Sequence, residues 1–470
     1  MNFDVSATER KEIWDYLIEQ LELFYGNAYN RKVSPELNFG EIKDFINPLL
    51  DNLKSKEVIQ HVLSGLDNYT VHTSHPSYFG LFNPRANFPS ALADTITAIF
   101  NPQLAAWSHA PFAVEVEAML IKSFAKKFGY ADNESDGVFT SGGAEANLTA
   151  LLTALNNKYP KYATDGLRSL QNQPVIYCTS ESHHSIIKAV SVAGLGINSV
   201  RKIPQNAKFQ IQLQELENLI ESDIQARFEP LMLIATMGTT GSGIIEPVKE
   251  FSAIAKQYKM WLHADAAYGG GAILSEEYKY LLSGIELADS ITFDAHKWMS
   301  VSMSASIFLT KHKEILNQTF RVTADYMPKE AGSLDVTDPF THSIQWSRRF
   351  IGLKVYLSLL MFGWKGYEET INHHFLMGKL LNKKLKENDW IIFYESDFPI
   401  ICFGKNYFAD DANIALKISN KIINSGKAWL SVYKVNDINT LRVCITNYLT
   451  NENDLDSLIV LVNSVELGES

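Results

Sequence analysis

Cysteine is scarce in this chain of 470 residues. Its three cysteines, Cys178, Cys402 and Cys444, lie far apart and lack the short spacings that metal ligands show. The sequence therefore predicts neither a disulfide framework nor a zinc site, and we expect no bound metal. A reducing compartment fits this cysteine usage best.

The sequence also lacks a long apolar run, and its first residues, MNFDVSATERKEIW, include acidic residues and no apolar leader. We therefore expect a cytoplasmic protein without a membrane partner. Basic residues are in the minority, with 42 Lys and Arg against 53 Asp and Glu and a net charge of −11. This balance argues against a nucleic-acid partner, although a local basic pocket for one phosphate stays compatible with it.

Hydrophobic residues make up 46% of the chain, which is enough for a large folded core. Residues 1–86 alternate apolar and charged positions at helical spacing, which predicts an N-terminal helical segment, either a dimer arm or an ordinary peripheral layer. In residues 87–366, short β-rich runs alternate with helical stretches, which predicts a large α/β domain with a mostly parallel sheet. Residues 367–470 predict a small α+β domain.

Two glycine-containing turns follow predicted strands. In TSGGAEAN, from Thr140, the glycines allow a tight turn, and the free N–H groups of the following helix suit a phosphate. In MGTTGSG, from Met237 to Gly243, hydroxyl groups and glycines follow an apolar strand. Either turn alone is equally compatible with an ordinary connection between elements.

Polar side chains occur where predicted strands end, which is where open α/β sheets bind their ligands. Asp265 lies in the apolar run WLHADAAY, and a buried carboxylate requires a cation or a hydrogen-bond donor as partner. A structural salt bridge is the alternative role for it. His183 and His184 follow another strand, and the local sequence does not decide between them or exclude a structural role.

Lys297 lies in SITFDAHKWMSVS, a largely apolar and β-prone run from Ser290 to Ser302. We expect this strand to desolvate its amine and so favour Schiff-base chemistry, whereas the alternative is a lysine that reaches the surface. A phosphate-binding turn, an imidazole, a buried aspartate and a lysine follow one another along the chain. Pyridoxal phosphate requires these four groups, and their combination predicts a site for it.

These segments resemble the pyridoxal-phosphate-dependent group II amino-acid decarboxylases, which include the aromatic-L-amino-acid, histidine and glutamate decarboxylases. The resemblance extends over most of the chain and rests on HPSYFGLFNPRAN, WSHAPFAVEVEAM, TSGGAEAN, SESHHSIIKA, ATMGTTGSG, WLHADAAYGGG, DAHKW and WSRRFIGLKVY. It implies a large α/β domain of the fold-type I transferase kind. It also implies decarboxylation of an L-amino acid and a homodimer with its sites at the subunit interface.

The resemblance implies roles for individual residues. Lys297 is similar to the lysine that binds the cofactor aldehyde, Asp265 to the carboxylate that keeps the pyridine nitrogen protonated, and His183 to the imidazole stacked on the ring. The remaining matches near the cofactor are Ala267 on the opposite ring face, Gly143, Ala144 and His296 around the phosphate, and Thr240. Tyr326, in FRVTADYMPK, resembles the tyrosine of the mobile catalytic loop that is proposed to protonate the substrate carbon, which favours amine over aldehyde formation.

Two positions depart from animal aromatic decarboxylases, which have serine and asparagine near the phosphate. This chain has Ala144 and Asp294 there. The carboxylate of Asp294 must avoid the phosphate or pair with a cation, and we expect backbone groups to supply more of the phosphate contacts.

The substrate follows less directly from the residues. Phe82 and Trp107 match positions of the side-chain pocket, and Arg442, in LRVCIT, resembles an arginine of the C-terminal domain that faces the site. Their aromatic character favours an aromatic amino acid. Arg85 and His109 suit an acidic or imidazole side chain, so histidine, glutamate, aspartate and 2,4-diaminobutyrate remain alternatives.

Two further classes of protein share these groups. An aminotransferase, aldolase or aldehyde synthase would use the same lysine and aspartate with a different fate of the substrate bonds. A cofactor-binding regulator or scaffold without catalysis would also keep the pocket.

Overall fold

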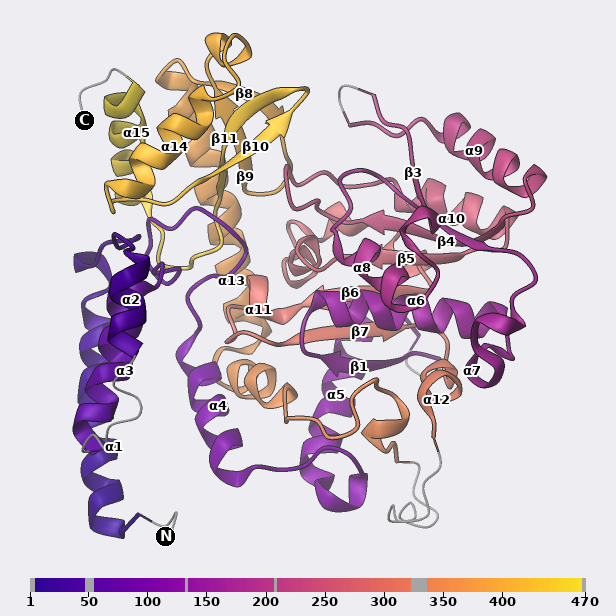
Figure 1. Cartoon of the computed structure of the whole chain (residues 1–470), viewed down its shortest axis with the longest axis horizontal. Coiled ribbons are helices and arrows are strands. Elements are labelled where there is room, and N and C mark those ends of the chain that lie inside the picture. The colour runs from indigo at the N-terminus through magenta and orange to yellow at the C-terminus, as the bar shows by residue number, and fades with distance from the viewer. Residues whose placement is uncertain (1–4, 47–54, 132–133, 207–208, 323–335, 467–470) are drawn as a thin grey trace. The chain divides into compact units, whose positions relative to one another are not determined.

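The computed structural model describes residues 5–46, 55–131, 134–206, 209–322 and 336–466 (Figure 1). The chain forms two compact units. One comprises Met1–Leu81, Lys379–Phe393 and Ile401–Ser470, and the other comprises Phe82–Gly378 and Tyr394–Ile400. Within the described ranges, no helix combines the length and the apolar character needed to cross a membrane.

The unit that contains Phe82–Gly378 is built on a seven-stranded sheet with the order β1-β7-β6-β5-β4-β2-β3. Its strands are β1 (Asp136–Thr140), β2 (Pro174–Cys178), β3 (Val200–Lys202), β4 (Glu229–Thr236), β5 (Trp261–Asp265), β6 (Ser290–Asp294) and β7 (Ser306–Thr310). The neighbours from β3 to β6 are parallel, and β7 runs antiparallel to both β6 and β1. The predicted mostly parallel sheet is therefore confirmed.

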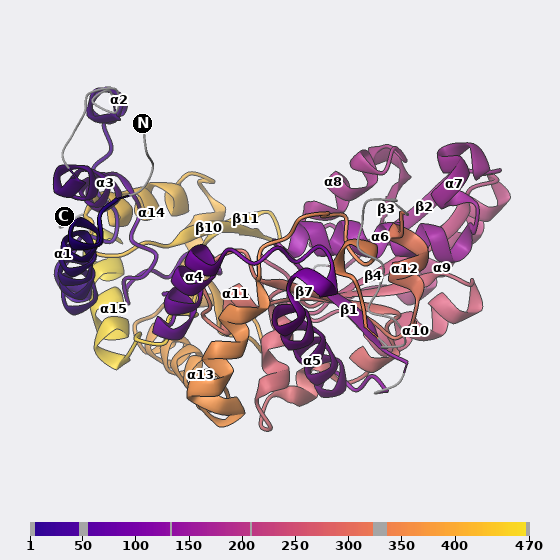
Figure 2. The ribbon, with the colours of Figure 1, turned by 90° about the horizontal axis from the view of Figure 1, so that it is seen from below.

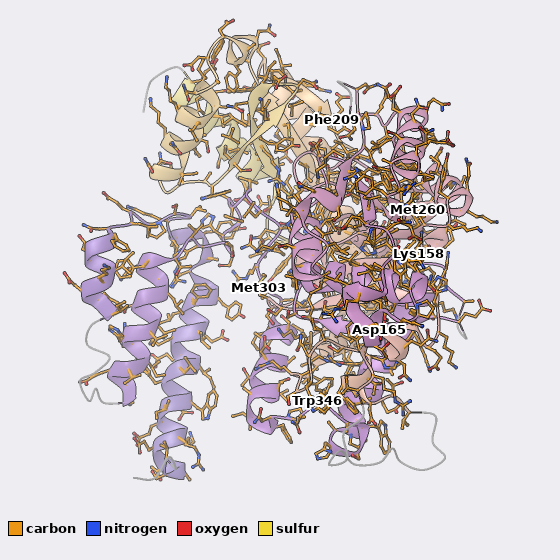
Figure 3. The ribbon with its side chains drawn as sticks, turned by 45° about the vertical axis from the view of Figure 1, so that its right-hand side comes forward. Lys158, Asp165, Phe209, Met260, Met303 and Trp346 are labelled. Atoms are coloured by element: carbon orange, nitrogen blue, oxygen red, sulfur yellow. The ribbon has the colours of Figure 1, made fainter. Side chains whose placement is uncertain are left out.

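Helices cover both faces of this sheet. Figure 2 shows α6 (Gly143–Lys158) and α8 (Ser185–Val192) on one face, and α5 (Pro111–Lys127) and α10 (Val248–Gln257) on the other. Every residue of β2, β5, β6 and β7 is consequently buried, which explains why these strands read as continuous apolar runs. Lys158, the last residue of α6 (Figure 3), places its Nζ 3.5 Å from Glu229 Oε1 at the start of β4.

Further helices of this unit surround the sheet or lead away from it. They are α4 (Phe88–Phe100), α7 (Tyr162–Asp165), α9 (Leu213–Gln225), α11 (Ala295–Trp298), α12 (Ile315–Phe320) and α13 (Gly352–Glu387). The helical conformation of α13 is interrupted at Gly363, whose φ of 62° is a conformation that glycine adopts without strain. The division between the two units falls near the end of α13.

The other unit combines helices with a small sheet of order β10-β11-β9-β8. Its elements are α1 (Ala7–Gly26), α2 (Phe39–Ile46), α3 (Ser55–Tyr69), β8 (Ile391–Glu395), β9 (Ile400–Gly404), α14 (Ile414–Asn424), β10 (Ser431–Val435), β11 (Ile438–Cys444) and α15 (Glu452–Glu466). Ser6 caps α1, because its side chain accepts a hydrogen bond from the Glu9 backbone at 3.2 Å. The three cysteines of the chain are free and buried.

The position of Lys297 differs from the expectation. Strand β6 ends at Asp294, and Lys297 lies in the single turn of α11 rather than in a strand. The chain turns here because Ser300 adopts a φ of 51° and donates its N–H to Lys297 O at 3.2 Å. This turn returns the chain as the antiparallel strand β7 and leaves the Lys297 side chain partly exposed.

Candidate active site

The candidate residues gather where β4, β5 and β6 end. Thr236 of β4 pairs with Asp265, the last residue of β5, and Asp265 pairs in turn with Thr292 of β6. Asp294 ends β6 two residues further on. Because parallel strands bring their carboxyl ends to the same edge of a sheet, the two aspartates lie at the edge where such sheets bind ligands.

Asp265 is 4% exposed and has hydrogen-bond donors on both carboxylate oxygens. Asn147 Nδ2 donates to Oδ2 at 2.9 Å, and the Ala267 backbone N–H donates to Oδ1 at 3.2 Å. The expected donor partners of this buried carboxylate are thus present. Both hydrogen bonds fix the orientation of the carboxylate.

A directed series of hydrogen bonds leads to Asn147 from within the sheet. Trp261 Nε1 donates to Ser290 Oγ at 2.8 Å, and the same hydroxyl lies 2.8 Å from His263 Nδ1. His263 Nε2 lies 3.0 Å from Asn147 Oδ1, which can only accept, so His263 carries its proton on Nε2. Burial lowers the pKa of His263 to about 4, and the ring is therefore neutral near pH 7.

His183 has an equally defined tautomer. The Ser185 backbone N–H donates to His183 Nδ1 at 3.2 Å, and Ser185 Oγ lies 2.9 Å from the same nitrogen. Because Nδ1 accepts, the neutral ring carries its proton on Nε2. Much of His183 is open to solvent, yet partial desolvation lowers its pKa below the ordinary value of 6.5, against the opposing charge of Asp265.

His183, Asp265, Asp294 and Lys297 form one electrostatic group, which we call the Lys297 cluster. The charges of Asp265, Lys297 and Asp294 all act on the pKa of His183. The structure thus brings together the last residues of β5 and β6, a lysine of α11 and a histidine that precedes α8.

Within this cluster, Lys297 pairs with Asp294. Lys297 Nζ lies 3.0 Å from Asp294 Oδ2, and Ser306 Oγ donates to Asp294 Oδ1 at 2.5 Å. His296 Nε2 lies 3.8 Å from the same carboxylate, and its Nδ1 is 2.9 Å from Ala305 O. Desolvation by burial lowers the pKa of His296. Asp294 therefore pairs with a cation, one of the two arrangements that we expected.

An aromatic pair lies beside the amine of Lys297. The rings of Phe82 and Tyr268 are stacked with centroids 4.0 Å apart, and Lys297 Nζ lies 5.4 Å from the centre of the Phe82 ring. The structure thus places Phe82, which we expected at the substrate pocket, next to the amine of Lys297.

The glycine turn and the loop after β4 complete this edge of the sheet. Gly143 and Ala144 form the first turn of α6, where the backbone N–H groups have no acceptors within the helix. A methyl group at Gly143 would lie 2.9 Å from Asp294 Oδ2, so this turn directly adjoins the Lys297 cluster. Thr240 follows β4 in a loop whose first residue, Met237, donates its N–H to Asp265 O at 2.9 Å.

Three residues that we expected at the site are not placed near the Lys297 cluster by the described structure. Trp107 Nε1 donates to Glu115 Oε1 at 2.8 Å and its backbone N–H to Asp338 Oδ1 at 2.7 Å, and neither partner belongs to the Lys297 cluster. Arg442 belongs to the other unit, where Nη1 donates to Gly80 O at 2.8 Å. Tyr326 lies outside the described residues.

Asn147, Ser185 and His263 were not singled out from the sequence. For two of these residues, the spacing in the sequence could have indicated a position near the site. His263 precedes Asp265 by two residues in a strand, which places both on one face, and Asn147 follows Gly143 by one helical turn. No comparable signal identifies Ser185, since its role depends on the position of α6.

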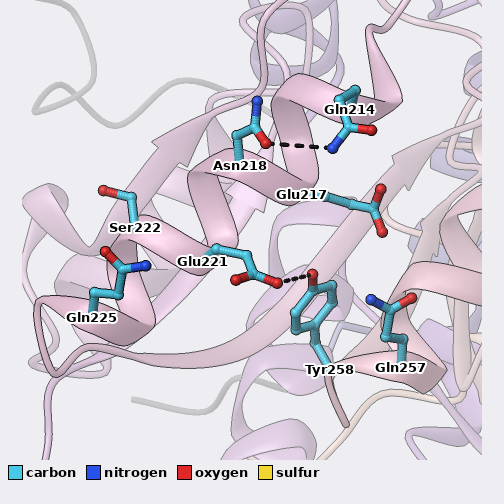
Figure 4. A pocket seen from close by; sticks show the side chains of 8 residues that line it. All are labelled: Gln214, Glu217, Asn218, Glu221, Ser222, Gln225, Gln257 and Tyr258. Atoms are coloured by element: carbon cyan, nitrogen blue, oxygen red, sulfur yellow. Dashed lines mark hydrogen bonds between the residues drawn. The ribbon is translucent and has the colours of Figure 1, made fainter.

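A polar hollow of about 480 Å³ lies elsewhere, between α9 and α10 (Figure 4). Its lining residues are Gln214, Glu217, Asn218, Glu221, Ser222, Gln225, Gln257 and Tyr258. Several of them bond to one another, as Tyr258 does to Glu221 at 2.9 Å. The hollow contains no residue of the Lys297 cluster and offers no cation to a phosphate.

The residues of the Lys297 cluster fit pyridoxal phosphate. A partly exposed amine suits its aldehyde, a carboxylate held by two donors suits its pyridinium N–H, and the open first turn of α6 suits its phosphate. Among the described residues, no group of three or more His, Cys, Asp or Glu side chains is arranged to hold a metal ion.

Comparisons with known proteins agree with this chemistry. The chain is 26% identical over 473 residues to an aromatic-L-amino-acid decarboxylase of Bacillus atrophaeus, covering 99% of this chain and 97% of that protein. It is 24% identical over 477 residues to a 4-hydroxyphenylacetaldehyde synthase of Rhodiola rosea, covering 98% and 95% of the two chains.

Solved structures share the fold. The structure of Oryza sativa TDC with PLP and tryptamine matches with a TM-score of 0.93 at 21% identity, covering 100% of this chain and 99% of that one. Residues 50–406 match the family described as the pyridoxal-dependent decarboxylase conserved domain. The chain therefore belongs to the pyridoxal-phosphate-dependent amino-acid decarboxylase family, as its motifs predicted.

Proposed function

We propose that this chain converts an aromatic L-amino acid into the corresponding amine and CO₂. The family match over residues 50–406 is the observation that carries the reaction class. The aromatic substrate is supported by the Bacillus atrophaeus relative, which is named for it, and by the similar fold of a Catharanthus roseus tryptophan decarboxylase in complex with L-tryptophan. The stacked pair Phe82 and Tyr268 beside Lys297 offers an apolar surface to such a side chain.

Pyridoxal phosphate, when bound, supplies an electron sink for the electron pair that remains on the substrate carbon after CO₂ leaves. The residues proposed to line its site are Lys297, Asp265, Ala267, His183, Gly143, Ala144, Thr240, His296 and Asp294. Lys297 provides the amine for its aldehyde. Asp265 is held by its two donors and provides the acceptor for the ring N–H.

His183 has two properties that suit proton transfer at the substrate carbon. Its Nδ1 is occupied by the donors of Ser185, so its proton is on Nε2. Its lowered pKa keeps the ring neutral near pH 7. We propose that His183 positions the reacting group with its ring and passes a proton through Nε2, with Tyr326 as the final donor.

Formation of an aldehyde is the second candidate reaction. The Rhodiola rosea relative is named 4-hydroxyphenylacetaldehyde synthase and matches 98% of this chain. The tyrosine at position 326 favours the amine, in keeping with the family resemblance. Histidine, glutamate, aspartate and 2,4-diaminobutyrate are the alternative substrates.

We also propose that the protein is a cytoplasmic homodimer whose subunits share the active sites. Three free, buried cysteines suit a reducing compartment. Large apolar side chains that are exposed in the single chain, such as Ile99, Phe100 and Phe112, suit a contact with a second copy. Trp107 and Arg442 are the proposed substrate contacts outside the Lys297 cluster.

The test is a product assay on the full chain loaded with pyridoxal phosphate. Each proteinogenic amino acid, dopa and 2,4-diaminobutyrate is supplied in turn, and CO₂, amine, aldehyde and peroxide are measured. We expect amine and CO₂ in equal amounts from an aromatic substrate. Amine without equivalent CO₂, or aldehyde with peroxide as the main products, would contradict the proposal.

Two lysine variants identify the cofactor-binding amine. Lys297→Ala should lose both the visible absorbance of the bound cofactor and the activity. Lys311→Ala removes a lysine that pairs with Asp289 at 3.2 Å and should retain both. Retention of the absorbance by Lys297→Ala would show that another amine binds the cofactor.

A further inference from the structure

The carboxylate of Asp294 lies directly over the start of α6. Both of its oxygens would be within 3.1 Å of a methyl group built on Gly143, the first residue of that helix. Asp294 is only 2% exposed, and the Ser306 hydroxyl fixes its Oδ1 at 2.5 Å. A buried negative charge is therefore held against the positive end of a helix of 16 residues.

The carboxylate of Asp294 also forms an ion pair with the amine of Lys297. Lys297 Nζ lies 3.0 Å from Asp294 Oδ2, and His296 Nε2 lies 3.8 Å from it. Because burial lowers the pKa of His296, this ring is neutral near pH 7 and adds little positive charge. The amine of Lys297 is thus already paired with an anion of the chain itself, and this anion adjoins the first residue of α6.

The side chain of Ala144 in the first turn of α6 provides no hydrogen-bond donor to balance the negative charge of Asp294. Ala144, the second residue of α6, has a methyl group and no hydroxyl to donate. A phosphate at this turn therefore depends on backbone N–H groups and accepts a neighbouring carboxylate. At separations of a few ångströms, two negative charges in a partly buried site repel each other strongly.

We propose that the charge of Asp294 opposes the phosphate of pyridoxal phosphate at the start of α6, so that this chain holds its cofactor weakly and exchanges it. The inference rests on the cofactor site of the proposed function and adds a residue that limits affinity. It predicts that the phosphate contributes less to cofactor binding than it would with a neutral side chain at position 294.

The test compares the cofactor with its analogue that lacks the phosphate. Cofactor-free full-length protein is titrated with pyridoxal phosphate and with pyridoxal, and binding is followed by visible absorbance and tryptophan fluorescence. The ratio of the two Kd values measures the contribution of the phosphate, because any change in the reactivity of Lys297 affects both compounds alike.

Asp294→Asn removes the charge and keeps the size and an acceptor for the Ser306 hydroxyl. We expect this variant to raise the ratio of Kd for pyridoxal to Kd for pyridoxal phosphate at least tenfold, which is about 1.4 kcal/mol. Asp294→Ser, a smaller neutral replacement, should behave in the same way if the asparagine variant folds poorly.

Ser306→Ala is the matched control, because it removes the partner of Asp294 and leaves the charge. In Ser306→Ala, the ratio of Kd for pyridoxal to Kd for pyridoxal phosphate should stay within about twofold of the value for the unmodified chain, a change of under 0.5 kcal/mol. An unchanged or lower ratio in both Asp294 variants, or an equal rise in Ser306→Ala, would overturn the inference while leaving the proposed function intact. Failure of the unmodified chain to bind pyridoxal phosphate would overturn both.

Discussion

Asn147 donates its side-chain amide to Asp265 Oδ2 at 2.9 Å and, with the same nitrogen, to Ser185 Oγ at 2.9 Å. It thereby joins the carboxylate at the end of β5 to the hydroxyl that bonds His183 Nδ1. Its Oδ1 accepts from Thr292 Oγ1 at 2.9 Å and from His263 at 3.0 Å. Replacing Asn147 therefore affects several buried polar groups at once.

Asn147→Asp is the sharpest change at this position. It keeps the shape of the side chain, removes a donor from Asp265 and places a second carboxylate next to it. The lost donor and the repulsion between the two carboxylates displace Asp265 from its position at the cofactor ring, so we expect kcat to fall roughly tenfold to 100-fold. The measurement is kcat against pH, together with the visible spectrum of the bound cofactor.

Asn156→Asp is the control for that variant, since Asn156 lies on the same helix and donates to Leu152 O at 2.9 Å. It should change kcat by less than about twofold, a barrier change of under 0.5 kcal/mol. Equal losses in the two variants would mean that an additional charge on α6 is harmful for general reasons, and that the contact with Asp265 has no special role.

Ser185→Ala tests the hydrogen bonds that define the tautomer of His183. The substitution removes the hydroxyl and keeps the backbone N–H, so Nδ1 loses one of two donors that stabilise the neutral ring, and the pKa of His183 should rise. Because we propose that the neutral ring is active, the acidic limb of kcat/KM against pH should move to higher pH by the same amount. Ser191→Ala, at an exposed position of α8, should leave the limb in place. A limb that moves equally in both variants, or in neither, would contradict the role of Ser185.

Two neighbouring glycines offer a matched pair at the phosphate turn. A methyl group at Gly143 would meet Asp294 Oδ2 at 2.9 Å, whereas one at Gly142 would have no neighbour within 4 Å. Gly142 has an extended φ of 176°, which any residue adopts. We expect Gly143→Ala to weaken the binding of pyridoxal phosphate at least about tenfold, because the turn must open to relieve this contact, a cost of about 1.4 kcal/mol.

Gly142→Ala should leave the Kd for the cofactor within about twofold, a change of under 0.5 kcal/mol. Fluorescence titration of the cofactor-free variants measures both values. A similar loss of cofactor affinity in Gly143→Ala and Gly142→Ala would show that binding depends on the flexibility of the glycine pair. It would also show that the space beside Gly143 has no special role.

The parallel part of the large sheet could be predicted because its strands are covered on both faces. Such strands appear in the sequence as continuous apolar runs, and β2, β5 and β6 are buried at every position. The turn at Lys297 was missed for the same reason, since an apolar run does not reveal where a strand ends. Here the positive φ of Ser300 ends it, and the sequence gives no clear signal for that conformation at a serine.

The candidate site could be predicted as far as its chemistry depends on residue type and chain order. Lys297, Asp265 and the pair His183 and His184 were singled out in this way, and the structure brings Lys297, Asp265 and His183 together. The contacts that orient them could not be derived, because Ser185 meets Asn147 only after α6 and α8 have packed on one face of the sheet. The choice between His183 and His184 likewise required the family resemblance.

Glu246 is a buried acid outside the proposed cofactor contacts, and it predicts a specific dependence of stability on pH. Its Oε1 accepts from Thr179 Oγ1 at 2.5 Å and its Oε2 from the Thr236 N–H at 2.7 Å. Burial raises the pKa of Glu246 from 4.5 to about 7, and the negative charges of Glu181 and Asp265 act in the same direction. Between these two values, the folded chain binds more protons than the unfolded chain.

The contribution of Glu246 to the free energy of unfolding therefore falls as pH rises from 4.5 to 7, by on the order of 3 kcal/mol in total. Glu246→Gln cannot ionise and should remove this part of the pH dependence. The buried His263, with a pKa lowered to about 4, destabilises the fold as pH falls below 6.5, but this effect is common to both proteins and cancels in their difference.

The quantity to measure is therefore the difference in free energy of unfolding between Glu246→Gln and the unmodified chain, from urea denaturation at several pH values between 4.5 and 8. We expect the difference to change in favour of the variant as pH rises and to level off above pH 7. Glu250→Gln, at an exposed position of α10, should show a constant difference. A constant difference for Glu246→Gln as well would mean that its carboxyl ionises at its ordinary pKa, so that the hydrogen bonds from Thr179 and Thr236 offset the cost of its burial.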